Sequence, residues 1–172
     1  DPYALYHKVQ GECKKWLEDY PKYKKTPEGQ GVQYEYASYL FAEAVQKDKD
    51  LKGTEGKGLA NQAQKYLTAL VELEGDYSEK ANNLKIAIDY KILGAKTNIE
   101  DFQTFEKAFL KAQFAMLELN KVGKKMGGAA GGEKEKLEAQ YKENLRQTVN
   151  YLQLSLNLAD SKTPLAQLDE AR

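Results

Sequence analysis

The strongest constraint on the fold is an apolar stripe in the middle of the chain. Over residues 99–122, apolar side chains recur at alternating intervals of three and four residues, namely at Phe102, Phe105, Phe109, Ala112, Met116 and Leu119. This spacing puts one side chain per helical turn on a single face, whereas a half-buried strand would alternate every second residue. The segment is therefore predicted to be an amphipathic helix that buries this face against a neighbour.

The same periodicity predicts six further helices, and signals for strands are nearly absent. The predicted ranges are about 2–20, 27–48, 58–74, 77–93 and 133–159, with a seventh helix beginning near Leu165. The stripe of the 133–159 helix consists of Leu137, Tyr141, Leu145, Val149, Leu152 and Leu156. Two glycine-rich segments, 52–58 and 123–132, are predicted to be loops because glycine costs roughly 1 kcal/mol in a helix interior. The fold class is therefore all-α.

Composition excludes some classes of function. Lys and Arg total 26, as do Asp and Glu, and only Arg146 and Arg172 are arginines. A neutral chain with so few arginines is not expected to bind nucleic acid. No apolar run approaches the roughly 20 residues that span a bilayer. Cys13 is the only cysteine, which rules out an internal disulfide and leaves the compartment open.

Three segments resemble the junctions of tetratricopeptide repeats. The first joins Trp16–Pro21 to Tyr34–Ala44, with a Tyr-Pro turn followed by a helix that carries small residues. The second joins Ala63–Leu70 to Gly75–Ala81, and the third is Thr163–Ala171. The variants found in bacterial envelope assembly proteins look most similar around the Tyr-Pro turn. The standard unit is 34 residues long, and the intervals in this chain are wider.

This resemblance implies one tetratricopeptide-like domain over residues 1–172, folded as a right-handed α-solenoid. The first helix would be an unpaired B helix, and helices 2–3, 4–5 and 6–7 would form successive pairs. The implied function is a non-catalytic scaffold that binds a protein or peptide, with a bacterial periplasmic or cell-envelope location as one alternative. Because helical periodicity runs to both ends, we also expect a piece of a longer protein with exposed apolar stripes on its first and last helices.

The candidate binding surface combines the second and fourth helices. It comprises Tyr36, Tyr39 and Glu43 from the second helix and Lys85 and Asp89 from the fourth. Exposed tyrosine is a good contact residue because it offers a large surface at little entropic cost. The alternative for the two tyrosines is packing on the first or fourth helix. The alternative for the whole chain is a closed helical bundle with a structural or oligomerising role.

No catalytic or metal-binding pattern is complete, so neither an enzyme nor a cofactor is expected. The segment Asp48–Gly53 begins like a calcium loop, but Lys52 and Leu59 occupy positions that need oxygen ligands. The segment Gly127–Gly132 has the length of a phosphate loop but lacks its lysine. His7 and Cys13 are six residues apart and do not share a helix face. Only a pocket joining His7 to distant carboxylates would reopen an enzymatic function.

Overall fold

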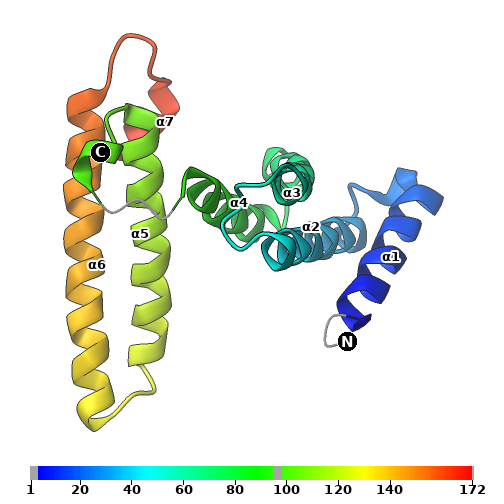
Figure 1. The fold of residues 1–172 in the computed structure, drawn as a ribbon, viewed down its shortest axis with the longest axis horizontal. Coiled ribbons are helices and arrows are strands. Elements are labelled where there is room, and N and C mark those ends of the chain that lie inside the picture. The colour runs from blue at the N-terminus through cyan, green and yellow to red at the C-terminus, as the bar shows by residue number, and fades with distance from the viewer. Residues whose placement is uncertain (1–3, 95–97, 172) are drawn as a thin grey trace. The chain divides into compact units, whose positions relative to one another are not determined.

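The computed structural model describes residues 4–94 and 98–171, and these residues form seven α-helices and no strand (Figure 1). The helices are α1 Ala4–Asp19, α2 Pro27–Lys47, α3 Thr54–Glu72, α4 Ser78–Leu93, α5 Phe105–Met126, α6 Gly131–Leu158 and α7 Leu165–Ala171. Short 3₁₀ turns cover Pro21–Tyr23 and Ile99–Asp101. The predicted all-α class is confirmed. Residues 2 and 3 of the first predicted helix lie outside the described residues.

The chain divides into two compact units, Asp1–Gly94 (unit 1) and Ala95–Arg172 (unit 2). In unit 1, α1 packs on α2, α2 on α3 and α3 on α4. Its core uses fully buried alanines at the helix crossings, including Ala37, Ala44, Ala60 and Ala63. Such small side chains let helix backbones approach closely, while Leu40, Leu67, Leu70 and Ile88 fill the space between them.

Threonine caps begin one helix in each unit. The Thr26 side chain accepts a hydrogen bond from the Gly29 amide at 3.3 Å, at the start of α2. The Thr104 side chain does the same for the Lys107 amide at 3.3 Å, at the start of α5. Each bond satisfies an amide that has no partner within the first turn of its helix.

Three helix boundaries near glycine residues differ from the prediction. Helix α3 begins at Thr54 instead of residue 58, so Gly56 and Gly58 lie inside it. Gly56 is buried, and a Cβ there would lie 3.0 Å from the Asp48 side chain and 3.3 Å from the Ala44 carbonyl oxygen. Helix α5 likewise continues through Gly123 to Met126, and α6 already begins at Gly131. Close packing therefore outweighs the intrinsic cost of glycine at Gly56.

Unit 2 is a long helical hairpin with a short third helix (Figure 1). Helices α5 and α6 run antiparallel over 22 and 28 residues and are joined by a short connection. Helix α5 begins at Phe105 and not at residue 99, although Phe102 before it is still fully buried. The predicted pairing of the sixth and seventh helices is limited to a small contact, because α7 has only seven residues and the main partner of α6 is α5.

Candidate binding surfaces

Tyr36, the first residue of the predicted surface, belongs to the core of unit 1. It is only 3% exposed, and its ring meets Tyr66 of α3 edge-on with the centroids 5.1 Å apart. The Gln62 side-chain amide donates to its hydroxyl at 3.5 Å. Burial raises the pKa of the Tyr36 phenol. The packing alternative therefore holds for Tyr36, whose ring and hydroxyl contact Tyr66 and Gln62 of α3, and this buried side chain offers no surface to a partner.

Tyr39 lies between α2 and α1. It is half-buried, and its ring meets Tyr6 of α1 edge-on at a centroid distance of 5.5 Å. Burial is the main cause that raises the pKa of its phenol, with a contribution from the nearby Glu35 carboxylate. Tyr39 thus contributes mainly to the contact that holds α1.

The three charged residues of the predicted surface are engaged in ion pairs near the helix contacts. Glu43 pairs with Lys47 at 3.3 Å, and Lys47 also pairs with Glu55 of α3. Lys85 pairs with Asp89 at 2.9 Å, and the Gln64 side chain of α3 donates to the same carboxylate. These contacts connect α3 to α2 and to α4. A role for Glu43, Lys85 and Asp89 in binding a partner stays a prediction.

A different surface stands out in unit 2, where three apolar residues of the predicted core stripes are exposed. Met116 of α5 is 43% exposed, and Leu145 and Val149 of α6 are 44% and 56% exposed. We call these three residues the open face. A packed hairpin interior would bury them, so no element among the described residues of unit 2, 98–171, covers the open face.

Helix α7 covers the neighbouring part of the same stripes. Buried Phe105, Phe109 and Ala171 form a cluster, and the residues packed against it are Leu152, Leu156, Ala159 and Leu168. Met116 lies seven residues, or two turns, beyond Phe109, and Leu145 lies two turns before Leu152. Because α5 and α6 are antiparallel, Met116 and Leu145 are displaced from the covered cluster in the same direction along the hairpin, by about 10 Å. The open face is thus the uncovered continuation of the surface that binds α7.

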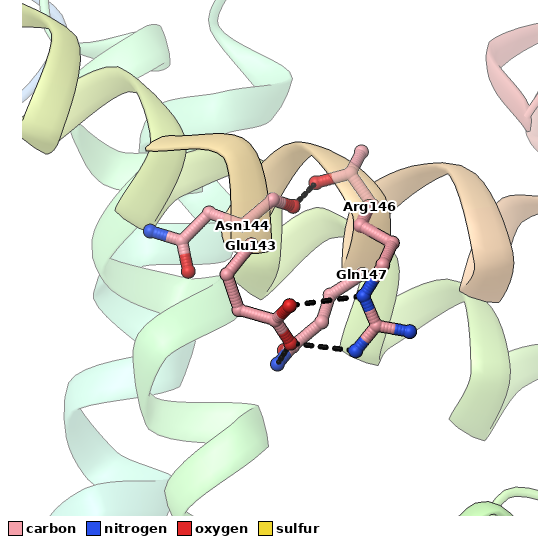
Figure 2. A network of polar contacts seen from close by, with 5 residues as sticks. Glu143, Asn144, Arg146 and Gln147 are labelled. Carbon is pink, nitrogen blue, oxygen red and sulfur yellow. Dashed lines mark hydrogen bonds and ion pairs between the residues drawn. The ribbon is translucent and has the colours of Figure 1, made fainter. Parts of the chain in front are cut away.

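Helix α6 also carries a network of polar contacts, which Figure 2 shows around Glu143 and Arg146. Arg146 donates two hydrogen bonds to the Glu143 carboxylate, at 2.9 and 2.7 Å, and the Gln147 side chain donates to it at 2.9 Å. These bonds, led by those from Arg146, lower the pKa of Glu143 to about 2. Gln147 is two residues, or about 200° around the helix, from both Leu145 and Val149, and Glu143 is the same angle from Leu145. The Glu143 and Gln147 side chains therefore lie on the side of α6 away from Leu145.

The residues once considered for chemistry do not converge. His7 is exposed on α1, and burial is the main cause that raises the pKa of the half-buried Cys13 thiol. The Asp48 carboxylate accepts hydrogen bonds from the amides of Asp50 and Gly53, so it serves to shape its own loop. Across residues 4–94 and 98–171, no group of three or more His, Cys, Asp or Glu side chains could hold a metal ion. In the same ranges, no helix is both long and apolar enough to span a membrane.

Three comparisons with known proteins identified no relative of this chain. The chain matches no protein-family model, and searches of curated proteins and of solved structures found no match either. The functional assignment therefore depends on the surfaces themselves.

Proposed function

We propose that this protein is a non-catalytic binding scaffold and that unit 2 captures an amphipathic helix of a partner protein on its open face. The observation that carries the proposal is the exposure of Met116, Leu145 and Val149 on the stripe that α7 covers elsewhere. Recognition of an amphipathic helix by an apolar surface is a common mode of peptide binding.

Helix α7 indicates the chemistry of the expected partner. Its Leu168 and Ala171, three residues apart, pack on the hairpin, and its Glu170 accepts a hydrogen bond from the Gln113 side chain at 3.0 Å. One exposed lysine, Lys142, lies near the open face, since it precedes Leu145 by three residues, or about one turn of α6. A partner helix with apolar residues at intervals of three and four and acidic flanks would fit both features.

For unit 1, the successive packing of α1, α2, α3 and α4 supports the tetratricopeptide-like, right-handed solenoid as part of the same proposal. In such a stack each helix contacts mainly its neighbours in the sequence. That order of contacts matches the expected role of unit 1 as a repeat-type scaffold.

The second candidate function is self-association through the open face. Two long hairpins that each expose an apolar stripe could join as a four-helix assembly. Lys142 beside the open face favours an acidic partner helix over a second identical face, because a symmetric contact would bring two copies of this lysine to the same interface.

The test uses a peptide built from α7 itself. A fluorescein-labelled 14-residue peptide with two tandem copies of Leu165–Ala171 repeats the apolar pattern every seven residues. We expect the full chain to bind it with a Kd of about 10–100 μM, as measured by fluorescence anisotropy. The double variant Leu145→Glu, Val149→Glu should bind about 30-fold more weakly, since two apolar contacts are replaced by buried charge.

The matched control is Asn150→Glu, which adds charge at an exposed position of α6 away from the stripe. It should leave the affinity within about twofold of the unchanged chain. Equal binding by the double variant and the control would contradict the proposal. A dimeric mass in light scattering that becomes monomeric in the double variant, without peptide binding, would instead favour self-association.

A further inference from the structure

The connection between α1 and α2 presents a cluster of exposed aromatic and basic side chains. We propose that this turn, Tyr20–Thr26, is a second binding site, which takes an acidic segment of a partner protein with an aromatic or apolar anchor. The site lies in unit 1 and does not depend on the open face of unit 2.

Three aromatic rings form a continuous row along the turn. The Trp16 and Tyr20 centroids are 5.5 Å apart, and those of Tyr20 and Tyr23 are 6.3 Å apart. Tyr20 is 47% exposed and Tyr23 is 43% exposed, while Trp16 packs against the core of unit 1. Tyrosine and tryptophan dominate the energetics of protein interfaces because they bury a large area with few rotatable bonds. The row therefore offers two anchors that are held on a packed base.

Two buried side chains of α2 hold the backbone of the turn through hydrogen bonds. Gln33 donates to the Lys24 carbonyl oxygen at 2.7 Å, and Gln30 donates to the Lys25 carbonyl oxygen at 2.9 Å. Gln30 is 8% exposed and Gln33 is 5% exposed, although surface water would satisfy the same carbonyls in an ordinary loop. A turn fixed in this way loses little conformational entropy on binding, which raises affinity.

Gly29 allows the turn to lie directly on α2. A Cβ atom at this position would lie 2.0 Å from the Tyr23 carbonyl oxygen and 2.9 Å from the Lys24 Cα. The Thr26 hydroxyl also donates to that Tyr23 oxygen at 2.9 Å. The positions of the aromatic rings are therefore set by α2 and not by the turn alone.

The charge of the turn points to an acidic ligand. Residues 20–27 include three lysines, Lys22, Lys24 and Lys25, and no acid, in a chain whose net charge is zero. The nearest following acid, Glu28, accepts hydrogen bonds from its own backbone amide and from Thr26, which lower the pKa of its carboxyl group. The Lys22 ammonium lies 5.0 Å from the centre of the Tyr23 ring, so one positive charge stands beside an anchor. Carboxylates flanking an aromatic residue would complement this arrangement.

The geometry favours an acidic polypeptide over a single-stranded nucleic acid. Nucleic-acid sites stack bases on open aromatic faces and commonly add arginine planes. In this turn the rings already contact one another, one face of Tyr23 holds Lys22, and no arginine is present in residues 20–27. Lysine ammonium groups beside a preformed aromatic row pair readily with single carboxylates.

The test measures binding of the full chain to a fluorescein-labelled 12-residue peptide of four Glu-Glu-Phe repeats by fluorescence anisotropy. We expect a Kd of about 10–100 μM at 50 mM salt that weakens at least threefold at 300 mM salt. The variants Tyr20→Ser, Tyr23→Ser and, separately, Lys22→Glu, Lys25→Glu should each bind at least tenfold more weakly.

The matched control is Lys57→Glu, Lys65→Glu, which makes the same change in net charge at exposed positions of α3. It should bind the peptide within about twofold of the unchanged chain, as should Leu145→Glu, Val149→Glu, because neither variant alters the turn. If the Lys22→Glu, Lys25→Glu variant and the Lys57→Glu, Lys65→Glu control lost the same affinity for the peptide, overall charge would explain the loss. That result would overturn the proposal. Tighter binding of a 12-nucleotide oligothymidylate than of the acidic peptide would overturn it in favour of a nucleic-acid site.

Discussion

Both units are built from amphipathic helices, but unit 1 buries the apolar stripe of its helices more completely than unit 2. In unit 1, four helices pack in succession, and the apolar stripe of α3 is buried at Leu67 and Leu70. In unit 2, two longer helices share a third helix of only seven residues, and the stripe of α6 is exposed at Leu145 and Val149. The stripes follow the same helical spacing in both units. Periodicity therefore determines which side of a helix is apolar, and the number of neighbouring helices determines whether that side is buried.

The largest expected difference between the units comes from truncating a leucine in each stripe. Leu67→Ala should reduce the free energy of unfolding by about 3 kcal/mol, since it opens a cavity in a closed core. Leu145→Ala should cost less than about 1 kcal/mol, because its side chain is 44% exposed and solvent fills the space. Urea denaturation with hydrogen exchange resolved by unit measures both costs. Equal costs would show that the open face is covered in solution.

A smaller difference is expected from the two threonine caps. Thr104→Ala should destabilise α5 by about 1 kcal/mol through loss of its bond from the Lys107 amide. Thr26→Ala should cost about 2 kcal/mol, because its hydroxyl also donates to the Tyr23 carbonyl oxygen. Amide exchange at Gly29 and Lys107 gives each local cost. The control is Thr68→Ala, at an exposed position inside α3, which should change the stability little. A smaller loss of stability for Thr26→Ala than for Thr104→Ala would contradict the proposed attachment of the turn to α2.

The smallest expected difference between the units concerns the cause of a lowered pKa at one carboxylate in each unit. The pKa of Glu143 is lowered to about 2 mainly by Arg146, whereas the pKa of Asp48 is lowered mainly by the Gly53 amide. Because the folded pKa of Glu143 lies below its ordinary value of 4.5, the ion pair contributes stability above that pH and loses it as pH falls toward 2. Arg146→Gln should therefore return the Glu143 midpoint toward 4.5 in a carboxyl-carbon NMR titration, and Gln147→Ala should shift it less.

Salt separates the two causes in the same titration. At 1 M salt, where the screening length is about 3 Å, the pKa of the exposed Glu143 should rise toward its ordinary value. The pKa of Asp48 should change less, because fixed backbone donors and not a mobile cation lower it. A larger shift at Asp48 than at Glu143 would contradict this assignment.

The number of helices and their apolar faces could be predicted from the sequence, but the helix boundaries near glycine residues could not. The apolar stripes identified all seven helices, since side-chain spacing is a local property of the chain. Gly56 inside α3 depends on contact with Asp48 and Ala44, and no local rule describes that contact. Thr104 does carry a local signal, because a threonine before Phe105 is a recognisable cap and would have placed the start of α5 correctly.

The candidate sites were harder to predict because exposure depends on tertiary structure. The sequence left Tyr36 open between a binding surface and packing, and the structure buries it because a middle helix such as α2 has neighbours on more than one side. Leu145 and Val149 were assigned to the core on the strength of their spacing, and the brevity of α7 leaves them exposed. The turn Tyr20–Thr26 could not be predicted as a site from the sequence, because the bonds that hold it, from Gln30 and Gln33, join residues five and nine apart.

Those two glutamines also define which part of the molecule can be moved as a block. An inserted or deleted residue within Tyr20–Thr26 would carry the Lys24 and Lys25 carbonyls away from their donors, so that the buried Gln30 amide would lose its acceptor and Gln33 would keep only the Gly29 carbonyl. The length of this connection is therefore as constrained as the sequence of a core helix. A graft of α1 onto another helical scaffold must include everything through Gln33, the seventh residue of α2, so the smallest portable segment ends nearly two turns inside α2 and not at the loop.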